Sequence, residues 1–328
     1  MQSNNKRLEW VDIAKGIGIF LVVLGHSQLP FEIRKWIYSF HMPLFFILSG
    51  YFFRSGKYGF AEFLKKKTLS LLVPYVFFML VTWIGFKVIN HPVYMPAYSL
   101  TDFLIYGPGS DPIWFLITLF FVEVLYFVLD LHIISKTKNP QIAKFVVCLL
   151  SFIGSLVIKY QFIGSLPYNI QNIPFYLFFY TIGVLRLVDI QEKMVLWVLM
   201  LLLVLNILAE HNMPYGIAQS DVLYLCVAGY FIALWGAFLL MNFSYKLSIL
   251  KNPCLQIIKN IICFFGKYSI VVLGLHTVIV RSVRCAFEPL GLPNSISSPI
   301  RQLVLWIILA LAIFMLNRWT PILIGKKR

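Results

Sequence analysis

Residues 13–29, IAKGIGIFLVVLGHSQL, decide how this chain folds. The run is apolar enough and long enough to cross the hydrocarbon core of a bilayer as one helix. It lacks the small-residue cleavage site of a signal peptide, and Asp12, Lys15 and His26 are built into it or lie beside it. The stretch therefore predicts a membrane-spanning helix that stays in the protein.

Nine further apolar runs of similar length follow it. They are continuous and about twice as long as the tilted strands of a membrane barrel, which predicts helices. No linker or repeat divides the chain, so we expect one all-α, polytopic domain over residues 1–328, with about ten transmembrane helices and no fused soluble domain. The predicted spans are residues 13–29, 34–53, 68–88, 112–130, 142–158, 172–187, 193–209, 221–241, 260–287 and 299–324.

The composition excludes several other classes of protein. Hydrophobic residues make up 60% of the chain and charged residues 12%, whereas soluble domains carry roughly 25% charged residues. So few charges cannot cover a water-facing surface, which excludes a soluble enzyme and a disordered chain. Five cysteines in 328 residues make no disulfide framework.

The chain has a net charge of +15, and many of its basic residues lie in loops on one side of the predicted spans. Alternate loops are basic, whereas residues 90–112 contain no Lys or Arg. Because cytoplasmic loops collect Lys and Arg, this pattern predicts a multi-pass protein of the inner (cytoplasmic) membrane with both termini in the cytoplasm. It also argues against nucleic acid as a partner, since no basic patch is interleaved with stacking aromatic residues. The basic residues on the cytoplasmic side are Lys6, Arg7, Arg54, Lys57, Lys65, Lys66, Lys67, Lys136, Lys138, Arg186, Lys193, Lys246, Lys251, Lys259, Lys326, Lys327 and Arg328.

The first predicted span carries an acid, a base and an imidazole on one face. Asp12 and Lys15 are three residues apart, so they share a face near the cytoplasmic mouth. His26 follows Lys15 by eleven residues, which returns it to nearly the same face about 16 Å deeper in the membrane. Because a charged side chain at the bilayer centre costs about 2.5–3.5 kcal/mol, we interpret this stripe as functional.

Other ionisable residues fall at a similar predicted depth. His276 and Glu123 lie near the middle of two further spans, and His41 lies about seven residues below the outer end of another, which suggests that they share one polar cavity with His26. Each of the three also has a plainer interpretation as a hydrogen-bonded packing residue. We expect no metal, because no two of these ligands are spaced i, i+3 or i, i+4 on one helix.

Arginines and cysteines leave further alternatives open. Arg281 and Arg284 either clamp an anionic group of an acceptor or reach the outer lipid headgroups. Four of the five cysteines lie in apolar spans, where a buried thiol usually behaves as a small hydrophobe. Acyl transfer through a cysteine is the alternative, although no histidine is a sequence neighbour of any of the five.

Several motifs resemble those of the integral-membrane acyltransferase family 3. Asp12-Ile13-Ala14-Lys15, with His26 eleven positions after Lys15, resembles the family's first-helix signature, in which the basic residue is more often Arg. The run YSFHMPLFFILSGY at 38–51 is similar to the family's phenylalanine-rich second-helix motif. Lys15 and the His41-Met42-Pro43 sequence are more similar to the fucose 4-O-acetylase-like branch, among the envelope polysaccharide O-acetyltransferases. Weaker landmarks in family order are Lys65-Lys66-Lys67 with Pro74-Tyr75, Trp114-Phe115-Leu116, and Gly266-Lys267-Tyr268-Ser269 leading to His276.

The resemblance implies an enzyme of the cell-envelope membrane. It would move an acyl group, usually acetyl, from cytoplasmic acyl-CoA to a sugar hydroxyl of an envelope glycan or a lipid-linked precursor. Acetyl-CoA would be the donor substrate, and no metal cofactor is implied. A basic vestibule would hold the donor's phosphates, and its candidate residues are Lys15, Arg54, Lys65, Lys66 and Lys67.

The family resemblance and the polar face of the first predicted span together suggest a role for each polar residue. A neutral imidazole at depth can accept the proton of an attacking hydroxyl, so we hypothesise that His26 is the general base. Lys15 would orient the donor or His26, and Asp12 would pair with Lys15. His41 or His276 would position the acceptor.

Two other functions fit the same residues. A transporter or flippase of a lipid-linked glycan would use the buried histidines as a proton relay, although the sequence lacks the inverted repeats that favour one. A membrane partner of a polysaccharide synthase would have no chemistry of its own. Release of CoA that depends on a glycan would distinguish the enzyme from both.

Overall fold

The computed structural model describes residues 8–27, 29–93, 99–101, 103, 112–161, 166–187, 196–211 and 223–326. These residues form helices and turns, with no strand among them. Parts of the predicted spans (28, 193–195 and 221–222) and five predicted topogenic residues (Lys6, Arg7, Lys193, Lys327 and Arg328) lie outside the described residues. The α-helices are α1 Glu9–Gly25, α2 Phe31–Tyr51, α3 Phe60–Lys67, α4 Val73–Ile89, α6 Trp114–His132, α7 Pro140–Gln161, α8 Ile173–Leu185, α9 Leu196–His211, α10 Leu223–Ile249, α11 Pro253–Lys267, α12 Ser269–Phe287 and α13 Asn294–Trp319.

Within the described ranges, six helical stretches are long and apolar enough to cross a membrane. The shorter helices Ile170–Leu185 and Val198–Glu210 are also apolar. The chain is therefore a helical membrane protein. Helix α1 has 17 residues and α2 begins with a polar turn, so neither is among the six, and the count of about ten spans stays a prediction. The six stretches are Phe60–Ile89, Trp114–Lys136, Pro140–Lys159, Tyr224–Ile249, Ser269–Leu290 and Ile296–Trp319.

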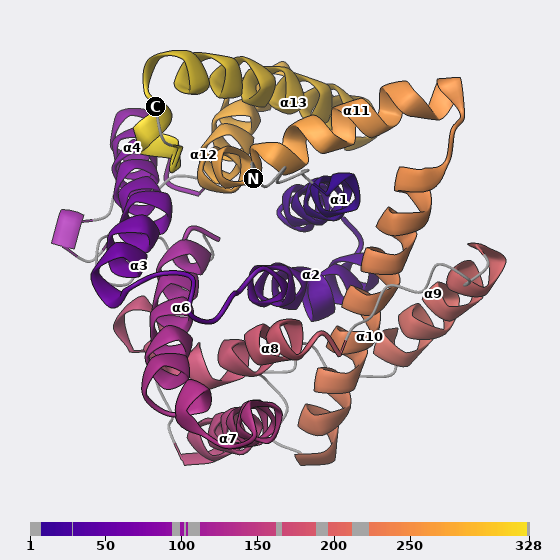
Figure 1. Ribbon diagram of the computed structural model, residues 1–328. Coiled ribbons are helices and arrows are strands. Elements are labelled where there is room, and N and C mark those ends of the chain that lie inside the picture. The colour runs from indigo at the N-terminus through magenta and orange to yellow at the C-terminus, as the bar shows by residue number, and fades with distance from the viewer. Residues whose placement is uncertain are drawn as a thin grey trace.

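Helix α1 lies at the centre of the molecule (Figure 1). It packs against α2, α10, α11 and α12, and Ile13, Ala14 and Val22 are completely buried along it. A helix surrounded in this way presents little surface to lipid. This is why α1 can carry Asp12 and Lys15, which would be costly on a lipid-facing helix.

Two glycines allow α1 and α11 to cross with their backbones in contact. A Cβ atom on Gly16 would overlap the backbone of α11, and one on Gly266 would overlap the Asp12 carbonyl. Small residues permit the same close approach in membrane helix pairs generally. Lys15 and Lys267 are the chain neighbours of these glycines, so the crossing brings both lysines to one cavity.

The prediction of a single span over residues 260–287 is wrong. Helices α11 and α12 replace it, and Tyr268 between them has a non-helical conformation (φ −114°, ψ 25°). Helix α11 is amphipathic: Ile257 is exposed, whereas Lys259 is buried and donates to the Ser248 carbonyl (3.2 Å). A straight helix through this region would carry the polar face of α11 into the apolar surroundings of α12.

Residues 60–89 form one continuous helical stretch, where the sequence predicts a basic loop followed by a span from residue 68. A π-helical turn, Thr68–Leu72, joins α3 to α4. Pro74 explains the wide turn, because it has no N–H to continue the α-helical hydrogen bonds. The turn directs Lys67 and Ser70 toward the interior, where both line a cavity.

Candidate functional site

Three histidines meet near the C-terminal end of α1. The ring centroids of His26 and His276 are 5.2 Å apart. The Tyr38 ring lies 6.0 Å from that of His26 and 5.3 Å from that of His41. The structure thus brings together, from α2, α12 and the turn after α1, the three imidazoles that the sequence places at similar depth.

Backbone carbonyls fix two of these rings. Nδ1 of His41 lies 2.7 Å from the Ile37 carbonyl oxygen, and Nδ1 of His276 lies 3.0 Å from that of Val272. Because a carbonyl only accepts, each Nδ1 carries a proton, which leaves Nε2 of the neutral ring as the acceptor. The His26 ring is half-buried and makes no hydrogen bond to a described residue. It is therefore the ring available to a substrate.

His26 lies beyond the end of α1, not within a helix as predicted. The helix ends at Gly25, and His26 is its C-cap (φ −88°, ψ 1°). The physical reason lies in the partners of two carbonyls. The Gly25 carbonyl accepts from Tyr38 Oη (2.8 Å) and the His26 carbonyl accepts from an Arg284 guanidinium nitrogen (3.4 Å), so side chains replace the next turn of the helix.

A second polar group lines a cavity of about 310 Å³ near the start of α12. Among the described residues that line it are four lysines, Lys15, Lys67, Lys267 and Lys326, and one carboxylate, Glu123. The cavity is therefore strongly cationic. Its other lining residues are Phe45, Ser49, Ser70, Leu71, Phe115, Leu116, Leu119, Gly266, Tyr268, Ser269, Ile270, Val271, Ile324 and Gly325.

Glu123 belongs to this lysine cavity, and the expectation that it shares a cavity with the histidines is not met. Nζ of Lys67 donates to a Glu123 carboxylate oxygen at 2.8 Å, and Glu123 is 3% exposed. The described residues that line the cavity include no histidine. Glu123 thus neutralises the Lys67 charge within the cavity.

Only two of the five residues predicted to bind the donor line this cavity. Lys15 and Lys67 line the cavity, whereas Arg54, Lys65 and Lys66 are exposed to solvent. Nζ of Lys66 donates to Tyr58 Oη at 2.6 Å, and this hydrogen bond lowers the pKa of the Tyr58 phenol. The three exposed cations can contribute a long-range field near the cavity but do not line it.

Sequence reasoning missed Lys267, Lys326 and Tyr38 as parts of the site. Lys326 Nζ lies 3.6 Å from the centre of the Tyr268 ring, which holds the C-terminal segment against α12. In the sequence, Lys326 was interpreted as one of the cytoplasmic basic residues that set the membrane topology. Tyr38 stands in the second-helix motif three residues before His41, and Lys267 stands in the landmark Gly266-Lys267-Tyr268-Ser269, so the motifs were the available signals for these two residues.

The two groups lie along the same three helices. Lys15 precedes His26 on α1, Phe45 follows His41 by four residues on α2, and Val271 precedes His276 by five on α12. Phe45 and Val271 line the cavity, so about 6–8 Å of helix separates its inner end from the histidines. One to two helical turns thus separate the inner end of the cavity from the imidazoles.

The structure defines a helical membrane protein whose central helices carry a cationic cavity and a histidine cluster. Comparison with known proteins gives its family. The family described as an acyltransferase domain, acyltransferase 3, matches residues 8–318, and the chain belongs to that family. The acyltransferase 3 domain thus covers nearly the whole of this helical membrane protein.

The chain is also similar to nodulation protein NolL of Mesorhizobium japonicum. The two are 34% identical over 116 residues. That match covers 31% of this chain and 30% of NolL, so the chain spans less than a third of this relative. No solved structure matches the chain.

Proposed function

We propose that this acyltransferase moves an acyl group, in the simplest case acetyl, from acyl-CoA to a sugar hydroxyl of a cell-envelope glycan or a lipid-linked precursor. Its family supports the acyl transfer. The observation that carries the proposal is the alignment of the lysine cavity and the histidines on α1, α2 and α12. One end suits an anionic donor, and the other suits a hydroxyl that must lose a proton.

The lysine cavity is the proposed donor site. CoA carries several phosphate charges, and ammonium groups bind phosphate oxygens through charge-assisted hydrogen bonds. Lys15, Lys67, Lys267 and Lys326 line the cavity, and Arg54 with the other exposed cations would attract the donor from solution. Because CoA is cytoplasmic, this end faces the cytoplasm of the inner membrane, together with both termini. The acyl end of the donor would pass Phe45 and Val271 toward the histidines.

His26 is the proposed general base for the transfer. Its ring would take the proton of the acceptor hydroxyl while that oxygen bonds to the acyl carbon. The thioester C–S bond breaks, and the CoA sulfur leaves as a thiolate that takes up a proton. The free ring nitrogens of His26 support this role, since His41 and His276 each use one nitrogen on a backbone carbonyl.

The remaining predicted residues have positioning roles in this proposal. Asp12 is buried one turn before Lys15 on α1, where its carboxylate would hold the Lys15 ammonium toward the donor. His41 and His276 would present Nε2 to the acceptor sugar. The family's transfer either proceeds directly or through a transient acyl-enzyme, and the residues described here act in the same way in both.

The test uses purified full-length protein in lipid nanodiscs with labelled acetyl-CoA and a mixture of envelope glycans as acceptors. CoA release that requires both the glycan and His26 would support the proposal. CoA release that is unchanged by His26→Ala would contradict the role of His26. Movement of a lipid-linked glycan without CoA release would instead identify the transporter.

A further inference from the structure

The inner end of the lysine cavity is walled by two aromatic rings. Phe45 of α2 and Phe115 of α6 both line it, and their ring centroids lie 5.8 Å apart. Both residues are buried, with 8% and 6% of their surface exposed. Three buried aliphatic residues complete this end, Leu116, Leu119 and Val271. The inner end of the cavity is therefore apolar.

The lysines lie farther along the same helices. Glu123, which accepts from Lys67, follows Phe115 by eight residues on α6, which is about 12 Å of helix. Lys267 precedes Val271 by four residues, or about 6 Å of helix. A donor whose phosphates meet these lysines would therefore place its acyl group against the two rings.

The Phe45 ring lies at the level between the cavity and the histidines. It reaches from α2 to α1, because a Cβ atom on Gly18 would come within 3.1 Å of Phe45 Cζ. On α1, Gly18 lies three residues after Lys15 and eight before His26. On α2, Phe45 lies four residues after His41. An acyl group that travels from the lysines to His26 therefore has to pass this ring.

Neighbouring side chains hold the two rings in place. Phe115 packs edge-on against Phe46, with 5.1 Å between ring centroids, and Phe46 stacks on Tyr176 of α8 at 4.3 Å. The tip of the Phe45 ring is held against Gly18. Because buried side chains are close-packed, a ring held in this way moves aside only at a cost. The space beside the rings therefore limits the size of the acyl group.

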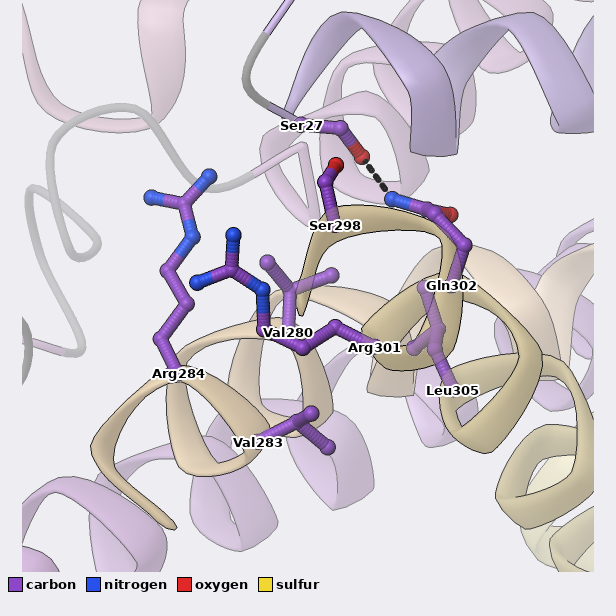
Figure 2. A pocket seen from close by; sticks show the side chains of 8 residues that line it. All are labelled: Ser27, Val280, Val283, Arg284, Ser298, Arg301, Gln302 and Leu305. Atoms are coloured by element: carbon purple, nitrogen blue, oxygen red, sulfur yellow. Dashed lines mark hydrogen bonds between the residues drawn. The ribbon is translucent and has the colours of Figure 1, made fainter. Parts of the chain in front are cut away.

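A second pocket near His26 is too small for an acyl chain. It lies between α12, α13 and the turn after α1, and its volume is about 20 Å³, which is room for about one water molecule. In Figure 2, Gln302 extends toward Ser27, and its Nε2 donates to Ser27 Oγ at 2.5 Å. This pocket offers a donor no way to His26, whereas the lysine cavity has a volume of about 310 Å³.

We infer that Phe45 and Phe115 select the acyl group of the donor by size, so that acetyl is accepted and butyryl is rejected. This inference rests on the proposed function, because it assigns a selectivity to the donor site of that reaction. The acetyl group would pass the two rings with its thioester carbon directed toward His26. Each further methylene group would have to displace the Phe45 ring from Gly18.

The test compares acetyl-CoA with butyryl-CoA as donors for the full-length protein in nanodiscs, with a mixture of envelope glycans as acceptors. Wild type should prefer acetyl-CoA at least about tenfold in kcat/KM for CoA release. In Phe45→Leu this preference should fall about tenfold, which corresponds to about 1.4 kcal/mol, because the smaller side chain leaves room for the longer chain. Phe115→Leu is the second variant and should change the preference in the same direction.

Phe121→Leu is the matched control. Phe121 is also a partly buried phenylalanine of α6 but is not among the described residues that line the cavity, so this variant should keep the wild-type preference. The unfolding temperature of each variant shows whether it is folded. Calorimetric titration of each donor without glycan, corrected for empty nanodiscs, measures the selection separately from catalysis.

Three results would overturn the inference and leave the proposed function in place. One is equal use of the two donors by wild type, and another is an unchanged preference in both Phe45→Leu and Phe115→Leu. The last is an equal loss of preference in Phe121→Leu, which would make the selection a general effect of packing. Binding of acetyl-CoA over butyryl-CoA without any CoA release would refute the proposed function and support the selection. Absence of binding and release with both donors would refute both.

Discussion

Tyr38 Oη donates a 2.8 Å hydrogen bond to the Gly25 carbonyl, so a side chain of α2 closes the end of α1 directly before His26. The Tyr38 ring also lies near both the His26 ring (6.0 Å between centroids) and the His41 ring (5.3 Å). The position of the proposed base is therefore set by a neighbouring helix.

Tyr38→Phe should misplace His26 without unfolding the protein. The ring and its packing remain, but the hydrogen bond is lost, which costs about 1 kcal/mol. We expect kcat to fall about fivefold with KM for acyl-CoA unchanged, because the donor cavity is not touched. Steady-state CoA release measures both constants. Tyr224→Phe, at a 70% exposed tyrosine, is the control and should behave as wild type.

His26→Ala should abolish most of the acyl transfer. Positioned general bases contribute roughly 10²–10⁴-fold, so we expect a loss of at least about 100-fold in kcat with normal expression and unfolding temperature. His132→Ala, at an exposed histidine at the end of α6, should retain full activity. Equal losses in both variants would indicate a general effect on the fold and not a catalytic role.

Substitutions in the Lys67–Glu123 ion pair should affect protein stability and donor binding in different ways. Lys67→Gln leaves the nearly buried Glu123 carboxylate without its cation, and such losses cost about 3–5 kcal/mol in fully buried pairs. We expect a lower unfolding temperature and a higher KM for acyl-CoA. Adding Glu123→Gln should restore the unfolding temperature but not the KM. Recovery of both would mean that Lys67 does not contact the donor.

Lys65→Gln is the matched control for this pair. Lys65 is a near neighbour of Lys67 in the same basic run but is exposed outside the cavity. Its loss should change KM by less than about twofold at physiological salt, since exposed charges are screened.

Gly266→Ala should destabilise the crossing of α1 and α11. The added methyl group would overlap the Asp12 carbonyl, which the backbone cannot relieve by a rotamer change. Overpacking of this kind typically costs about 1–3 kcal/mol, so the yield of monodisperse protein and its unfolding temperature should fall. Gly59→Ala is the control, because a Cβ there meets no atom within 4 Å and Gly59 has φ −72°. Similar losses at both positions would show that the crossing has no special role.

Local patterns in the sequence predicted much of the architecture. Each of the ten apolar runs lies mostly on helix in the residues that the structure describes, because burial and membrane insertion depend on runs of apolar side chains that can be read from the sequence. The histidines were grouped correctly, since a helix converts sequence position into depth. Predicted depth also grouped Glu123 with the histidines. That grouping is wrong, because Glu123 lines the lysine cavity.

The sequence by itself determined that this is an all-helical membrane protein of the acyltransferase 3 family, with polar residues concentrated on its first helix. Only the tertiary structure decided which polar residues meet. The end of α1 at Gly25 and the pairing of Glu123 with Lys67 both depend on contacts with other helices. Such contacts set how each helix is rotated about its own axis and where it ends. The hydrophobic periodicity of a single segment does not encode either property.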